Sequence, residues 1–172
     1  MEEKLIRGTG LPEDGSRAGA KDLAEAINAG LHLSGRDWSQ YSPLSLAWIG
    51  DTVYDLIVRS ILLEKGNRKP DQLHRMASAI VNARAQAALM RKIRHKLSDQ
   101  EQQIYRRGRN AKPAHKAKNA DMAEYLEATA FECLVGWLYL TRQYERLLAL
   151  VRETCDEEKE QPAKSGGFGY GT

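Results

Sequence analysis

Residues 42–66 read SPLSLAWIGDTVYDLIVRSILLEKG, and this stretch decides the fold class of the chain. Ser42 and Pro43 are suited to the N-cap and the first position of a helix, and Gly66 is suited to end it. Apolar residues between them recur at spacings of three and four, without a sustained alternation of period two. They occur almost all round the middle of the segment, so we expect a central, buried helix in an all-α fold.

The rest of the chain shows the same helical spacing on both sides of this segment. It predicts a short helix over 21–29, a long one over 70–96, and two more over about 120–141 and 144–155. Ser98 and Glu101 form a capping-box pattern that begins a further short helix through Tyr105, and the residues after it, RRGRNAKPAHKAKN (106–119), are predicted to form a loop. A length of 172 residues favours one domain, which we place at 19–158, between predicted disordered ends at 1–18 and 159–172.

Cysteine usage and hydropathy narrow the class of protein. Cys133 and Cys155 are the only cysteines, and neither belongs to a Cys/His cluster, which argues against a disulfide framework or a zinc site. No apolar run approaches the roughly 20 residues that span a bilayer, and the N-terminus does not resemble a signal peptide. We therefore expect a cytoplasmic protein with no membrane partner.

Basic residues are concentrated in the middle of the chain. From Arg68 to Lys118 there are 14 Lys and Arg against three acidic residues, although the net charge of the whole chain is only +3. Such a block within a folded region indicates a polyanionic partner, most commonly nucleic acid. The alternative is a helix face that is simply solvated.

Two apolar segments each carry an acidic residue beside a glycine. Asp51 follows Gly50, and Asp55 lies one turn further on the same side of the helix; Glu132 lies one turn before Gly136. A carboxylate among apolar residues must be paired, protonated or bound to a cation. If the two helices cross at the glycines, Asp51 and Glu132 could hold a hard divalent cation such as Mg²⁺, whereas ion pairs with basic side chains are the structural alternative.

At these residues the chain resembles a known family. LAWIGDTVYDLIVR (46–59) resembles the signature helix of the ribonuclease III family, and ATAFECLVGWLYL (128–140) resembles its second active-site helix. The resemblance covers roughly Asp37 to Leu150. It implies the catalytic-domain fold of that family, a homodimer, and Mg²⁺-dependent cleavage of double-stranded RNA that leaves 5′-phosphate ends, with Asp51 and Glu132 as the catalytic and metal-binding acids.

The departures from the family pattern are informative too. Ala47 and Thr129 occupy positions where longer relatives carry further acids. That pattern, the run LHRMASAIVNARAQA (73–87) and the absence of a double-stranded-RNA-binding domain after the catalytic helices resemble the Mini-III branch of the family. In that branch the implied task is maturation of 23S ribosomal RNA ends. Thr129 or water would then stand in for a missing acid, and Asp55 is a further candidate for support.

The basic residues supply candidate RNA contacts. A-form RNA is recognised through phosphates and 2′-hydroxyls, which Arg, Lys and Asn side chains of the predicted loop could contact. The candidates are Arg106, Arg107, Arg109, Asn110, Lys112, Lys116 and Lys118, together with the pair His74 and Arg75. Trp38, Trp48 and Trp137 are better explained as core or dimer contacts. The alternative function is a non-catalytic RNA-binding or ribosome-associated protein that kept the fold and lost half of its metal acids.

Overall fold

The computed structural model describes residues 22–112 and 119–155, so the ends predicted to be disordered lie outside the described part. The chain divides into two compact units, Met1–Gly35 and Arg36–Thr172. The described part of the first unit contains helix α1 (Leu23–Gly30). The side chain of Asp22 caps it by accepting a hydrogen bond from the backbone N–H of Glu25 at 2.9 Å.

The second unit is built from helices alone over its described residues, which confirms the all-α fold class. They are η1 (Trp38–Gln40), α2 (Pro43–Glu64), α3 (Pro70–Val81), α4 (Ala83–Ile93), η2 (Arg94–Lys96), α5 (Asp99–Arg109), α6 (Asn119–Leu140) and α7 (Tyr144–Cys155). Ser42 caps α2 as predicted, and Ser98 and Glu101 form the predicted capping box of α5. No described helix has the length and hydropathy needed to cross a membrane.

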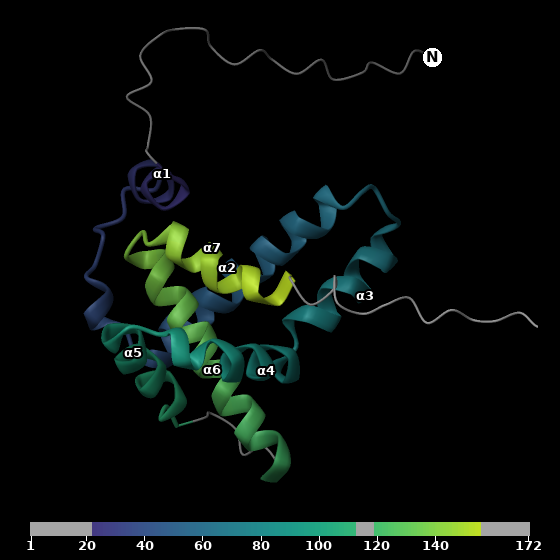
Figure 1. The fold of residues 1–172 in the computed structure, drawn as a ribbon. Helices are drawn as coiled ribbons and strands as arrows, with labels where there is room; N and C mark the ends of the chain where they lie inside the picture. The colour runs from purple at the N-terminus through teal and green to yellow at the C-terminus, as the bar shows by residue number, and fades with distance from the viewer. Residues whose placement is uncertain (1–21, 113–118, 156–172) are drawn as a thin grey trace, which may run out of the picture. The chain divides into compact units, whose positions relative to one another are not determined.

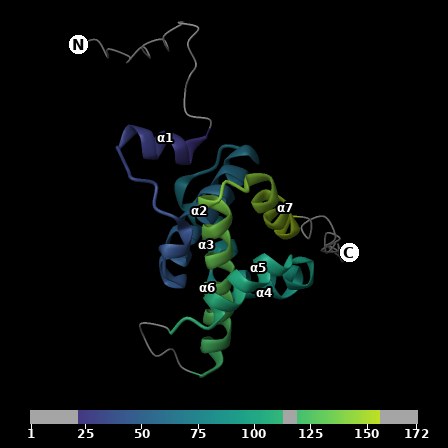
Figure 2. The same ribbon diagram turned by 90° about the vertical axis from the view of Figure 1, so that its left-hand side faces the viewer.

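Helix α6 is the central element of this unit. It runs through the middle of the ribbon in both views (Figures 1 and 2) and packs against α2, α4, α5 and α7. The prediction that the helix over 42–66 is the buried one was therefore wrong. Helix α2 packs against α6, α3 and α5, but it leaves Trp48 77% and Leu56 54% exposed.

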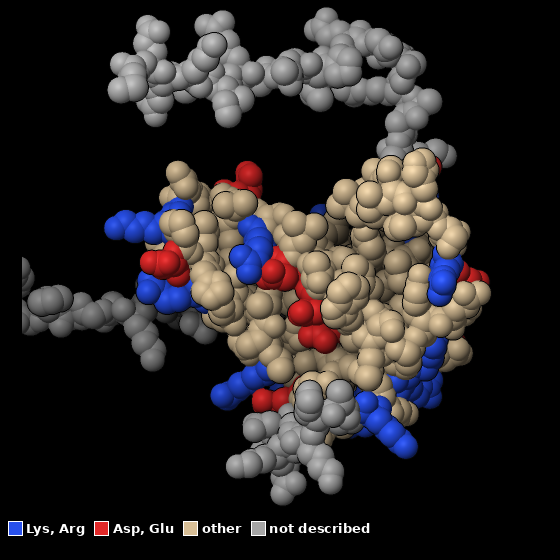
Figure 3. Space-filling view, turned by 180° about the vertical axis from the view of Figure 1, so that it is seen from behind, with Lys and Arg blue, Asp and Glu red and all other residues tan. Residues whose placement is uncertain are grey.

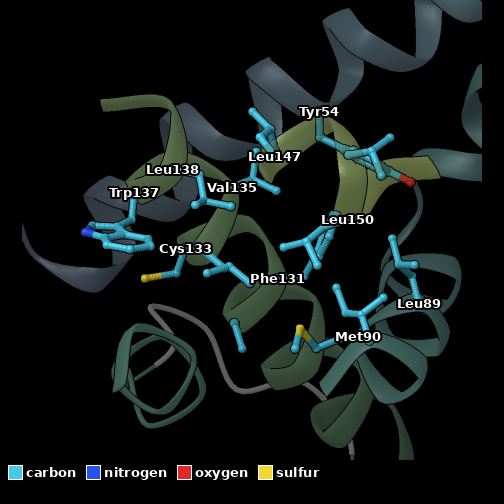
Figure 4. Packing of buried hydrophobic residues seen from close by; sticks show 14 of the residues in the cluster. Tyr54, Leu89, Met90, Phe131, Cys133, Val135, Trp137, Leu138, Leu147 and Leu150 are labelled. Carbon is cyan, nitrogen blue, oxygen red and sulfur yellow. The ribbon is translucent and has the colours of Figure 1, made fainter. Parts of the chain in front are cut away.

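The core lies between α6 and the helices that surround it. Figure 4 shows apolar side chains of α6 meeting those of α2, α4 and α7. Phe131 packs edge-on against Tyr54 of α2, with ring centroids 4.9 Å apart. The best-buried side chains, none more than 1% exposed, include Tyr54, Met90, Ile93, Phe131, Cys133, Leu134, Val135, Trp137 and Leu138. Dense packing of this kind fixes where each helix presents its polar residues.

The helix predicted over 70–96 is broken at Asn82, which corrects the sequence interpretation. Asn82 has extended backbone angles, φ −74° and ψ 156°. Its side-chain oxygen accepts a hydrogen bond from Ala85 N–H at the start of α4, while its amide nitrogen donates to the carbonyls of Ser78 and Ala79 at the end of α3. One side chain thus satisfies both helix ends, so the chain turns there with no glycine or proline.

Helix α5 continues beyond Tyr105 to Arg109, so the first four residues of the predicted loop are helical instead. Gly108, which suggested a helix break, is buried where α5 packs on α6. A Cβ on it would lie 2.7 Å from the Cβ of Cys133 and 2.9 Å from the Cα of Ala130. Glycine is required there by the close approach of the two helices, and the packing more than offsets its low helix propensity.

Candidate active site at the crossing of α2 and α6

Two glycines bring the backbones of α2 and α6 into direct contact. A Cβ placed on Gly50 would overlap the carbonyl oxygen of Glu132 and lie 2.7 Å from the amide nitrogen of Gly136. A Cβ on Gly136 would in turn overlap the carbonyl oxygen of Leu46. The crossing predicted from the sequence is therefore present. It sets Asp51, the residue after Gly50, beside Glu132.

The charge of Asp51 acts on the carboxylate of Glu132 across this crossing. Glu132 is half-buried, and its loss of hydration, followed by the charge of Asp51, raises its pKa to about 7. Asp51 is more exposed than the sequence suggested, but desolvation and the nearby charge of Asp55 still raise its pKa. Two neighbouring carboxylates whose pKa values are both raised favour a bound cation, which would offset both the repulsion and the lost hydration.

Gln86 of α4 is the residue of this site that the sequence interpretation missed. Its side chain is only 1% exposed, and its amide faces both acids, lowering the pKa of Asp51 and of Glu132. Neither its nitrogen nor its oxygen reaches hydrogen-bond geometry with a described residue. The sequence does contain a sign of it. Gln86 is a long polar residue on the apolar face of α4, the face that also carries Met90 and Ile93 four and seven residues later.

The other positions singled out in the sequence are Asp55 and the two residues that replace family acids, Thr129 and Ala47. Asp55 forms an ion pair with Arg59 one turn later, at 2.6 Å, and its second carboxylate oxygen is buried without a hydrogen bond. Thr129 and Ala47 are 4% and 5% exposed, so both are packed into the protein. Within the described ranges no three His, Cys, Asp or Glu side chains gather closely enough to form a metal cluster. The site therefore rests on two acids and one amide.

These groups suit Mg²⁺ by their chemistry. Mg²⁺ prefers oxygen ligands and is commonly held by one or two carboxylates while keeping several of its waters. Asp51 and Glu132 supply the carboxylates, and the amide of Gln86 is a buried polar group that lacks a partner. Figure 3 shows a short run of acidic side chains in the middle of one molecular face, with one basic side chain against its upper end and other Lys and Arg side chains toward the edges.

The predicted RNA contacts fall into exposed and engaged groups. Arg106, Asn110 and Lys112 are exposed on the last turns of α5 and just after it, and Arg106 also donates to the backbone carbonyl of Gln102 one turn earlier. Arg107 donates to the backbone carbonyl of Tyr41 and lies over the ring of Trp38, 5.9 Å from its centroid. His74 and Arg75 are exposed on α3, and Lys116 and Lys118 lie outside the described residues.

Arg109 is held by a buried acid at the base of the basic segment. Its Nε donates to Glu127 of α6 at 2.8 Å, and Tyr105 donates to the same carboxylate at 3.0 Å. Glu127 is 8% exposed, so this network fixes the end of α5 to α6. The charge of Arg109 is thereby partly neutralised, which leaves Arg106 and Lys112 as the freer cations on this side.

The family model and similar known proteins indicate the same family. Residues 44–143 match the Ribonuclease III domain. The chain is 47% identical over 118 residues to a protein of Enterococcus faecalis called Mini-ribonuclease 3, spanning 67% of this chain and 89% of that protein. It is also 47% identical over 114 residues to the Mini-ribonuclease 3 of Symbiobacterium thermophilum, spanning 66% and 88% respectively.

A solved structure agrees with these sequence matches. A crystal structure of a Fusobacterium nucleatum protein superposes with a TM-score of 0.63 at 31% identity, over 72% of this chain and 98% of that one. The domain match spans both helices that form the acidic site, from α2 through α6. The chain therefore belongs to the ribonuclease III family, as an endoribonuclease similar to its Mini-ribonuclease III members.

Proposed function

We propose that the chain hydrolyses double-stranded RNA in the presence of Mg²⁺, leaving a 5′-phosphate and a 3′-hydroxyl. The observation that carries this proposal is the position of Asp51 and Glu132 at the glycine-mediated crossing, where both carboxylates have raised pKa values. The ribonuclease III family generally depends on divalent metal ions and acts on double-stranded RNA, which is consistent with this donor set.

Asp51 and Glu132 are the residues that would hold the cation. Bound Mg²⁺ would supply the activation of water and the neutralisation of charge on the phosphate. The protein keeps the two carboxylates together because the backbones beneath them cannot slide apart without losing the Gly50–Gly136 contact. Partial burial of Glu132 strengthens its electrostatic interactions with whatever it binds.

We assign RNA docking to the exposed basic residues around the end of α5. Arg106, Asn110 and Lys112 can contact phosphates and 2′-hydroxyls without reading base sequence. The proposed RNA-binding set also keeps the other residues predicted from the sequence: Arg107, Arg109, Lys116, Lys118, His74 and Arg75. Their support is the local positive charge of the sequence from 68 to 118.

A homodimer is part of the same proposal, because cleavage of both strands of a duplex calls for two sites related by a two-fold axis. The exposed apolar side of α2 supports it. Trp48, Leu56 and Leu63 are 77%, 54% and 61% exposed and recur at spacings of eight and seven, which places them along one side of the helix. Trp137 is a core residue instead, with Trp38 packed edge-on against it at 5.9 Å.

Replacing Trp48 by Asp is expected to weaken self-association at least about thirtyfold, since an aromatic residue central to an interface commonly contributes 2 kcal/mol or more. Sedimentation equilibrium over a range of protein concentrations measures the effect. Leu148→Asp, at another exposed apolar residue, on α7, is the matched control and should leave the dimer intact. A monomeric wild-type protein, or a Trp48→Asp variant that dimerises normally, would contradict the proposed interface.

The resemblance to the Mini-III branch supports a 23S ribosomal RNA precursor as the natural substrate and the cytoplasm as the location. Cys133 is a buried free thiol, which is consistent with a reducing compartment.

The decisive experiment is incubation of the purified protein with a long RNA duplex and Mg²⁺. We expect internal cleavage that EDTA abolishes and that Asp51→Asn reduces by more than about a hundredfold, beyond the usual cost of losing an outer-shell group. Single-stranded RNA and duplex DNA of the same sequence should remain intact. Duplex binding without products by wild-type protein would refute the enzyme and favour the non-catalytic RNA-binding alternative, to which Ala47 and Thr129 point.

A further inference from the structure

Gln86 belongs to a different helix from both acids, yet its amide is near enough to lower the pKa of each. Asp51 comes from α2, Glu132 from α6 and Gln86 from α4, so three segments far apart in sequence converge. At 1% exposure, Gln86 is cut off from bulk water. Its position is set by neighbours on the same helix: Ala87, Leu89 and Met90 are all buried in the core.

The unfilled hydrogen-bonding capacity of this amide requires an explanation. A side-chain amide offers two N–H donors and a carbonyl acceptor, and leaving a buried polar group without partners costs about 1–3 kcal/mol. Buried glutamine in a core is therefore rare unless something satisfies it. The groups near enough to interact with it are the carboxylates of Asp51 and Glu132. A cation held by these acids, with its waters, would supply the missing partners.

We propose that Gln86 is a positioning residue of the metal site: with the cation bound, its amide nitrogen would donate to the carboxylates of Asp51 and Glu132, and its amide oxygen would accept a hydrogen bond from the water that the cation keeps. This inference rests on the proposed Mg²⁺ site. Ala47 and Thr129 occupy positions where longer relatives carry acids. By this inference, Gln86 of α4 supplies part of the polar surroundings of the cation that those acids would provide. Because the amide is neutral, it supplies this shell without adding a third negative charge.

The experiment is a Mg²⁺ titration of thermal stability in the absence of RNA, so that metal binding is measured without catalysis. Gln86→Leu should change the stability of the metal-free protein little, since it removes an unsatisfied polar group at similar volume but also the favourable interaction of the amide with the two carboxylates. Its Mg²⁺ affinity should fall about 10–100-fold, the usual effect of losing an outer-shell partner. Gln103→Leu, at an exposed position of α5, is the matched control and should bind Mg²⁺ as the wild type does.

Gln86→Glu provides a second variant in case leucine perturbs folding. A third carboxylate should destabilise the metal-free protein above neutral pH and should tighten Mg²⁺ binding. In the cleavage assay, Gln86→Leu should need a correspondingly higher Mg²⁺ concentration for half-maximal rate and recover most of its rate at saturation.

The results separate this inference from the proposed function. Mg²⁺ binding that depends on Gln86 in a protein that cuts no RNA would support the inference and refute the nuclease. Cleavage with a Mg²⁺ affinity unchanged in Gln86→Leu would support the nuclease and overturn the inference. A Gln86→Leu variant that loses stability without losing Mg²⁺ affinity would assign the residue a packing role and also overturn it.

Discussion

Glu132→Gln is expected to lose RNA cleavage by more than about a hundredfold while making the metal-free protein more stable at neutral and higher pH. Burial and the charge of Asp51 raise the pKa of Glu132 from 4.5 to about 7. The folded state therefore binds more protons than the unfolded state between these values, and stability decreases as the pH rises through them. Glutamine, which has no charge to desolvate, avoids that penalty.

The size of this gain in stability follows from the pKa shift of Glu132. Each pKa unit corresponds to about 1.4 kcal/mol, so the upper limit of the gain above pH 7 is about 3 kcal/mol. Below about pH 4.5 the two proteins should be equally stable, because Glu132 is then protonated in both states. Mg²⁺ should stabilise the wild type and leave Glu132→Gln largely unaffected, since only the wild type retains both acids.

Urea denaturation in EDTA at pH 5 and pH 8, with and without Mg²⁺, measures these differences. Glu64→Gln, at an exposed glutamate at the end of α2, is the control and should change neither stability nor cleavage. A Glu132→Gln variant that is less stable than wild type at pH 8 in EDTA would show that this carboxylate stabilises the fold. That outcome would refute its assignment as a strained metal ligand.

Alanine at Gly136 is expected to destabilise the protein by more than about 3 kcal/mol, enough to prevent folding of a marginally stable domain. The added Cβ would overlap the backbone oxygen of Leu46 and lie 2.9 Å from its carbonyl carbon. Backbone atoms cannot rotate away as a side chain can, so α2 and α6 must separate along their contact. Gly50→Ala, which meets Glu132 and Gly136 from the other side, should have a similar effect.

Denaturation monitored by circular dichroism gives the stability of both variants. Gly30→Ala is the matched control because it also lies in a helix but has nothing within 4 Å of the added Cβ. It should change stability by no more than about 1 kcal/mol, and in the stabilising direction if the last turn of α1 persists. Stabilities of Gly50→Ala and Gly136→Ala within that same margin would contradict the close crossing of α2 and α6.

Helix starts and the close approach of α2 and α6 were the features that sequence predicted best. Ser42 and Ser98 cap the helices that follow them, because a cap depends on residues within one turn of itself. Asp51 and Glu132 drew attention because each interrupts an apolar stretch beside a glycine. The glycines themselves implied the close approach that the structure contains at Gly50 and Gly136.

Burial was predicted less well, for a physical reason. Apolar residues all round α2 suggested that it is the central helix, but α6 occupies that place within one chain. The apolar pattern of a helix reflects all of its packing contacts, including any with a second chain. The exposure found for one chain reflects only the contacts within that chain. Trp48 is the residue at which the two differ most.

By itself, the sequence determined the helical class, the helix N-caps and the identity of the two candidate acids, because capping and periodicity depend on residues close together in the chain. The tertiary structure alone decided that α5 continues through Gly108, which its contact with α6 stabilises. It also decided that Gln86 interacts with Asp51 and Glu132. Those outcomes depend on how helices distant in sequence pack against α6. The residues within one helix do not specify which distant residues will become its neighbours.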